Sequence, residues 1–266
     1  MDRGLLKFKL RQNWLGALYV MTGMLFFGWM MVGAYNAFDM SQMMQQLGGA
    51  QDLMGAFIGT KGVLMWGISA FLAMAWRHPL ILVVIIGYSA SLGAGFAAKE
   101  VGEKTADLLF SRPVTRTRLL INDLIVSGGL LFLVTMVFSL ALYCGAAFLK
   151  LNPPAVSNFV LAGLQYFAFA LSILTLSYWV GGFVREGKTV ISVVSGVLTV
   201  MYTIEIVGGL WDKVEPLRNF SLFTYLTTLD ALQGKANLWH GMAVLFSVAI
   251  VSFVLAQRRM EKRDLT

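Results

Sequence analysis

The chain has 266 residues, of which 58% are apolar and 13% are charged, and it carries a formal net charge of +7. Soluble domains contain about half apolar and about a quarter charged residues, so this composition excludes an ordinary soluble protein and predicts a membrane protein. The single cysteine, Cys144, excludes an internal disulfide and a thiolate metal cluster.

Six apolar stretches are long enough to cross a membrane. A spanning helix needs about 20 apolar residues, because each residue rises about 1.5 Å against roughly 30 Å of hydrocarbon. The stretches lie at residues 14–38, 79–98, 124–148, 159–184, 189–210 and 238–256. The apolar run at 63–76 is shorter and ends at "RHP", so we expect an interfacial or re-entrant helix there. Residues 1–266 then form a single transmembrane domain.

The basic residues indicate an orientation. Most of the 21 lysines and arginines lie in the segments that would be cytoplasmic if the N-terminus is inside. This asymmetry predicts an even number of spans with both termini cytoplasmic. The net charge is therefore a topology signal and does not imply a nucleic-acid partner. A secretory signal over residues 1–34 is a rival interpretation, but its apolar run exceeds the usual length of about 7 to 15 residues.

The stretch "GFVREGKT", residues 182–189, fits the phosphate-loop pattern G-x-x-x-x-G-K-[ST]. A phosphate loop follows a short buried strand and opens a helix on a parallel sheet. Here the motif joins two predicted spans, and the chain has no room for such a sheet. We therefore interpret it as a cytoplasmic turn whose cations reach lipid phosphates.

Two carboxylates lie in or beside apolar stretches. Glu205 falls inside the fifth span, where an ionised group is costly and tends to face protein or water. It is either a substrate contact or a partly hydrated carboxylate near the interface that is hydrogen-bonded to a neighbouring helix, and the sequence leaves both open. Asp123, at the start of the third span, we interpret as a solvated residue favoured by the helix dipole.

The inner segment "KEVGEKTADLLFSRPVTRTRLL", residues 99–120, predicts a helix lying on the membrane surface. On a helix over 103–112, the polar side chains share one face and the apolar side chains share the other, and Pro113 ends the helix. Leu108 falls beside the polar face, which favours contact with a partner protein. An ordinary surface helix with one exposed leucine is the alternative.

Within this segment, "EVGEKTADLLFSRPVTR" resembles the signature of type-2 ABC exporter permeases, the ABC-2 family, which commonly reads E-x-x-G-T-x-x-x-L-L-x-x-P-V-x-R. The matching positions are Glu100, Leu108, Leu109, Pro113, Val114 and Arg116. The G-T pair of the family is interrupted, because Gly102 is followed by Glu103-Lys104-Thr105. The order of six spans, the "WRHP" before the second span and the ending "RRMEKRDL" also resemble the family.

The resemblance implies an all-α polytopic permease of the cytoplasmic membrane that is not itself an enzyme and has no cofactor of its own. It would pair with a second copy or a paralogue and bind separate ATP-binding cassette subunits, which hold the ATP and Mg. Residues 99–118 would form the coupling segment that docks on those subunits. The implied coupling residues are Glu100, Gly102, Glu103, Asp107, Leu108, Leu109, Arg112, Pro113 and Arg116.

The resemblance also implies that the second and fifth spans border the substrate path, which makes Glu205 a candidate path residue, and that short re-entrant helices within 211–237 close it. The residues agree with such helices, since Ser221 is a plausible N-cap and Gly234 a plausible stop. Two other functions stay open. A secondary transporter should show internal repeats and intramembrane ion-coordinating groups, and a membrane-embedded enzyme should show clustered catalytic groups.

Overall fold

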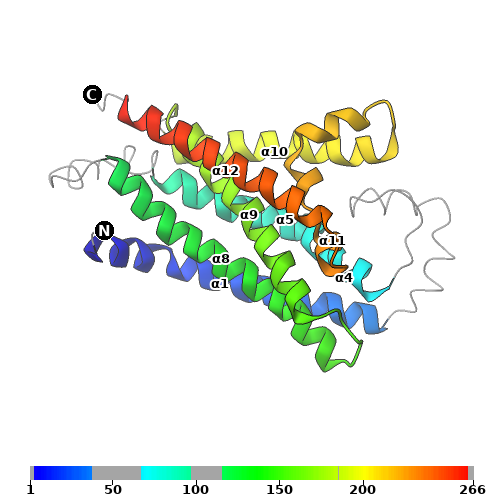
Figure 1. Cartoon of the computed structure of the whole chain (residues 1–266). Helices are drawn as coiled ribbons and strands as arrows, with labels where there is room; N and C mark the ends of the chain where they lie inside the picture. Colours follow the sequence, from blue (N-terminus) through cyan, green and yellow to red (C-terminus); the bar gives the residue numbers. More distant parts are fainter. Residues whose placement is uncertain (1–2, 38–66, 97–115, 185, 263–266) are drawn as a thin grey trace.

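The computed structural model describes residues 3–37, 67–96, 116–184 and 186–262 (Figure 1). All regular elements within these ranges are helices, so the described chain is all-α, as predicted. In chain order they are α1 (Arg3–Ala37), α4 (Ile68–Arg77), α5 (Pro79–Ala94), α8 (Arg116–Phe148), α9 (Val156–Gly181), α10 (Gly187–Leu210), η3 (Glu215–Phe220), η4 (Leu222–Tyr225), α11 (Thr228–Leu232) and α12 (Asn237–Glu261).

Five helices, namely α1, α8, α9, α10 and α12, are each long and apolar enough to cross a membrane. They coincide with five of the six predicted spans. Helices α1 and α8 begin several residues earlier than predicted, because backbone hydrogen bonding continues through the polar residues that flank an apolar stretch. The protein is therefore a polytopic helical membrane protein.

The second predicted span is the exception. Helix α5 has 16 residues and meets α4 at a bend of 43° around His78, and the two pass the length and hydropathy criteria only as a pair. The bend has a local cause: the residue before a proline avoids the helical region, and His78 is extended at φ −61° and ψ 131°. Pro79 then opens α5, and His78 Nδ1 accepts a hydrogen bond from the Leu80 N–H at 3.3 Å.

Helix α4 is the described part of the run expected to be interfacial or re-entrant. Most of its side chains are buried, including Trp76 at 0% exposure, and it packs against α11 and α1. Within the described chain, α4 therefore packs inside the bundle. The bent pair of α4 and α5 is either a broken span or a re-entrant loop, so the re-entrant helix expected at residues 68–76 stays a prediction.

Helix α9 is the centre of the molecule. It packs against α12, α8, α5, α11 and α10, and Figure 1 shows it crossing between α8 and α12. In its most apolar stretch 67% is buried, against 22% for α10. Small residues allow the neighbouring helices to approach closely. A Cβ on Gly93 of α5 would lie 2.5 Å from Ser177 Cβ of α9, and one on Gly163 would lie 3.0 Å from Ser139 Cβ of α8.

The two ends of the bundle differ. One end carries η3, η4 and α11, and we call it the outer end after the orientation predicted from the sequence (Figure 1). At the opposite end, which we call the inner end, α1 and α8 begin, α9 turns into α10, and α12 finishes. Among the described residues, each end contains a buried cluster of charged side chains.

Candidate functional site

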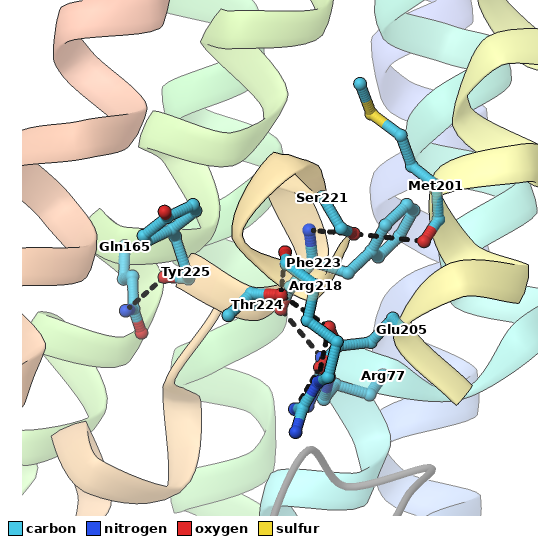
Figure 2. A network of polar contacts seen from close by, with 9 residues as sticks. All are labelled: Arg77, Gln165, Met201, Glu205, Arg218, Ser221, Phe223, Thr224 and Tyr225. Carbon is cyan, nitrogen blue, oxygen red and sulfur yellow. Dashed lines mark hydrogen bonds and ion pairs between the residues drawn. The ribbon is translucent and has the colours of Figure 1, made fainter. Parts of the chain in front are cut away.

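The most densely bonded polar cluster in the described chain surrounds Glu205 at the outer end. The Glu205 side chain is 1% exposed and lies five residues before Leu210, where α10 ends. Arg77 Nη2 lies 3.0 Å and Arg218 Nη2 lies 2.8 Å from Glu205 Oε1. Glu205 Oε2 accepts hydrogen bonds from Arg218 Nε at 3.3 Å and Thr224 Oγ1 at 2.5 Å. Figure 2 shows these side chains converging on the carboxylate. We call these four residues the outer cluster.

The four side chains come from four elements, which the cluster holds together. Arg77 is in the last turn of α4, where a cation is favoured by the helix dipole, directly before the bend at His78. Glu205 comes from α10, Arg218 from η3 and Thr224 from η4. Gly208 leaves room for the Arg218 stem, because a Cβ there would lie 2.6 Å from Arg218 Cγ.

Further hydrogen bonds complete the outer cluster. Arg77 Nη2 also donates to the Phe223 carbonyl at 2.7 Å, and Thr224 Oγ1 lies 2.6 Å from the Arg218 carbonyl. A buried charge is tolerated only when it is paired and well hydrogen-bonded, and both Glu205 oxygens meet that condition. The hydrogen bond to Glu205 raises the pKa of Arg218 above its ordinary value, so this group stays cationic. The carboxylate therefore acts as a clamp, because its contacts hold α4, η3 and η4 against α10.

The same contacts bear on the two roles that the sequence left open for Glu205. Its carboxylate is bonded to neighbouring protein groups in the described conformation, and the side chain is only 1% exposed, so it is not the partly hydrated carboxylate of the second alternative. Arg77 and Arg218 are far from Glu205 or separated from it by a helix end in the sequence, and their positions gave no sign that both would meet this carboxylate. A substrate contact at Glu205 would require the cluster to open.

Helix α9 fixes the rest of the outer segment. Gln165 Nε2 donates to the Tyr225 carbonyl at 3.0 Å and lies 2.6 Å from Thr227 Oγ1, and Asn158 Nδ2 donates to the Leu232 carbonyl at 2.9 Å. Figure 2 shows Gln165 reaching Tyr225 from α9. The segment between α10 and α12 is thus folded back over the outer end and held there by hydrogen bonds from α9.

Packing and caps in this segment agree with the sequence. The Phe223 ring is buried, with its centroid 5.2 Å from that of Phe169 and 5.1 Å from that of Tyr202. Ser221 caps η4 by accepting a hydrogen bond from the Phe223 N–H, and Gly234 follows α11 with φ +67°. The predicted cap and stop are both confirmed, although three short helices occupy the interval.

The structure corrects the environment predicted for Asp123. The sequence suggested a solvated residue at a helix start, but Asp123 lies within α8, is 2% exposed, and has Lys9 Nζ 3.3 Å from its Oδ1. Its Oδ2 accepts a hydrogen bond from Tyr178 Oη at 2.6 Å. The prediction failed because α8 begins at Arg116, which places Asp123 in the helix interior, where α1 and α9 cover it.

The phosphate-loop pattern lies at the inner end. Gly182 is the C-cap of α9, and α10 begins at Gly187, with the Lys188 side chain exposed. The motif therefore follows a long helix where a phosphate loop would follow a strand. The described structure agrees with the predicted turn between two spans.

Most implied coupling residues lie outside the described residues, namely Glu100, Gly102, Glu103, Asp107, Leu108, Leu109, Arg112 and Pro113. Arg116 is the first residue of α8.

Among residues 3–37, 67–96, 116–184 and 186–262, no three His, Cys, Asp or Glu side chains gather as metal ligands do. Comparisons of the chain with protein-family models, with curated proteins and with solved structures find no match.

Proposed function

We propose that this chain is the permease subunit of an ATP-binding cassette exporter of the ABC-2 type. Separate ATP-binding subunits would hydrolyse ATP, and a second copy or a paralogue would complete the membrane pore. The observation that carries the proposal is the outer segment, which folds back between the last two spans and is clamped onto α4 and α10. The coupling signature at residues 100–116 supports it from the sequence.

Under this proposal the outer cluster is a closed exit. Export toward the outer side requires the segment over the outer end to move, which separates Glu205 from Arg77 or from Arg218. An ion pair suits such a movement, because each group can be hydrated once water enters, whereas a separated apolar contact gains nothing from water. Glu205 would then line the open path, and the two arginines would attract anionic or polar parts of a substrate.

The proposed topology follows from the same arrangement. Helix α5 ends and α8 begins at the inner end, so under this proposal the inner end would face the cytoplasm together with the start of α1 and the end of α12. Exposed cations at this end, including Lys7, Arg11 and Lys188, fit the excess of positive charge on cytoplasmic loops. The membrane would be the cytoplasmic membrane, where ATP is available on the inner side only.

The direct test is association with an ATP-binding subunit encoded beside this chain. We expect co-purification and substrate-stimulated, vanadate-sensitive ATPase activity of the complex. Leu108→Glu should reduce co-purification severalfold or more, because an apolar side chain removed from water by docking contributes about 1.5 to 3 kcal/mol. Lys104→Ala, on the polar face of the same predicted helix, is the matched control and should have a smaller effect.

Two results would decide against parts of the proposal. If the complex forms equally well with Leu108→Glu, the docking surface lies elsewhere. If no neighbouring ATP-binding subunit associates with the chain, the exporter assignment fails. Measuring the particle size of the purified Leu108→Glu and Lys104→Ala variants distinguishes a loss of docking from a failure of the permease to insert and assemble.

A secondary transporter is the second candidate, and the bend between α4 and α5 favours it. Discontinuous membrane helices often surround the substrate and ion sites of such proteins, and here the break lies beside the buried cation Arg77. The two candidates differ in energy source. Uptake or release by the purified chain in liposomes, driven by an ion gradient without ATP-binding subunits, would favour the secondary transporter.

A further inference from the structure

A second buried ion pair lies at the inner end of the bundle. Lys9 Nζ lies 3.3 Å from Asp123 Oδ1, and the two residues are 6% and 2% exposed. Asp123 Oδ2 accepts hydrogen bonds from Tyr178 Oη at 2.6 Å and from Ser127 Oγ at 3.3 Å. The carboxylate therefore has a charged partner and two hydroxyl donors.

The pair joins the inner ends of four helices. Lys9 comes from α1, Asp123 from α8 and Tyr178 from α9. Phe96, two residues beyond the end of α5, lies against Lys9 and Tyr178. Its ring centroid is 5.8 Å from Lys9 Nζ and 5.9 Å from the Tyr178 ring centroid. A cation over an aromatic face is attracted to it, so the inner end of α5 is held against the other three helices.

The burial of Lys9 is unusual for its position. The basic residues on either side of it in α1, Lys7 and Arg11, are exposed. A lysine at the polar end of a membrane helix normally extends into water or toward lipid phosphates. Removing Lys9 and Asp123 from water costs free energy that their attraction only partly returns, and apolar side chains of similar size would pack there at lower cost. Stability alone therefore does not explain the pair.

A contact that must open repeatedly does explain it. Apolar surfaces resist separation into water, whereas a separated lysine and aspartate are both well hydrated. Helix α5 connects this contact to the outer cluster, since Arg77 lies two residues before its first residue and Phe96 two residues after its last. Helix α9 also reaches both ends, with Gln165 at the outer segment and Tyr178 at the inner pair.

We infer that Lys9, Asp123 and Tyr178 form an inner latch, which closes the inner end of the bundle and parts when that end opens to admit substrate. The inference rests on the proposed transport function and adds a gate at the inner end. In the described conformation both the latch and the outer cluster are closed. Breaking the latch alone should open the inner end while the outer end stays shut.

Thiol labelling of the purified full chain in lipid nanodiscs tests the latch without knowledge of the substrate. Cys144 is the only cysteine, so a Cys144→Ser background allows single reporters. Leu92→Cys reports on the inner half of α5, where the side chain is 7% exposed, and Thr228→Cys reports on the outer segment, where it is 1% exposed. The probe is a charged, membrane-impermeant maleimide.

We expect Lys9→Met to increase the labelling rate at position 92 about tenfold and to change the rate at position 228 less than twofold, since labelling follows the population of the open form. Tyr178→Phe, which removes only one hydroxyl, should give a smaller increase at position 92. Lys7→Met is the matched control for charge removal, because Lys7 is exposed, and it should leave both rates unchanged.

Two outcomes would overturn the inference. Unchanged labelling at position 92 in Lys9→Met and Tyr178→Phe would show that the pair is not a latch. Equal increases at both positions would show a general loss of stability, which assigns the pair a structural role. The labelling needs no ATP-binding subunit, so failure of the co-purification experiment would reject the exporter function separately from these results.

Discussion

Arg77 and Glu205 are 128 positions apart in the sequence, yet Arg77 Nη2 lies 3.0 Å from Glu205 Oε1 and both side chains are buried. This contact ties the bend between α4 and α5 to the outer part of α10. It also predicts an order of effects among the three charged residues of the outer cluster, because each substitution leaves a different charge behind.

Glu205→Gln removes the carboxylate that pairs with both Arg77 and Arg218, so we expect the largest loss of stability. Removing one member of a buried pair typically costs about 3 to 5 kcal/mol. Thermal unfolding of the purified chain in detergent measures the effect. Glu186→Gln is the control, because this carboxylate is exposed at the opposite end of α10 and makes no capping hydrogen bond. A variant of Glu205 with unchanged unfolding temperature would contradict the clamp described here.

Arg77→Met should destabilise the protein less than Glu205→Gln, because Glu205 keeps Arg218 as a partner. It should destabilise more than Arg218→Met. Arg77 is 3% exposed and also satisfies the Phe223 carbonyl, whereas Arg218 is 13% exposed. We expect about 2 to 3 kcal/mol for Arg77→Met and about 1 kcal/mol less for Arg218→Met. The reverse order in parallel unfolding measurements would show that Arg218 is the main partner.

Gly93→Ala should weaken the packing of α5 on α9. The added Cβ would lie 2.5 Å from Ser177 Cβ and 2.8 Å from the Leu174 carbonyl oxygen, so one helix must move. Overpacking of this kind costs about 1 to 3 kcal/mol. Gly87→Ala is the matched control on the same helix, because nothing lies within 4 Å of its added Cβ. We expect it to be neutral or slightly stabilising. Similar unfolding temperatures for both variants would contradict the close crossing.

Lys188→Ala should not affect nucleotide binding. Lys188 is exposed near the start of α10, in a turn that lacks the preceding strand of a phosphate loop. We expect the purified chain to show no ATP binding by calorimetry, and the variant to match the wild type in any complex with an ATP-binding subunit. Saturable ATP binding by the chain alone, lost in Lys188→Ala, would restore the phosphate-loop interpretation.

Local sequence was sufficient for much of the helical architecture. Spans depend on runs of apolar side chains, and caps depend on the residues beside a helix end, so both are readable over short distances. The spans that became α8 to α10 and α12, the cap at Ser221 and the stop at Gly234 all belong to this class. The helix ends were less predictable, because hydropathy does not register helical backbone that continues outside the apolar run.

Tertiary structure alone decided which charged groups are buried together. Glu205 was recognisable as costly inside an apolar stretch, but its two arginine partners come from segments on either side of it in the sequence. Asp123 was interpreted as a residue at a helix start, Lys9 lies before the first predicted span, and only the packing of α1, α8 and α9 removes both from water. The physical reason is range: hydropathy and backbone sterics act between neighbours along the chain, whereas burial and ion pairing depend on helices that meet only after folding.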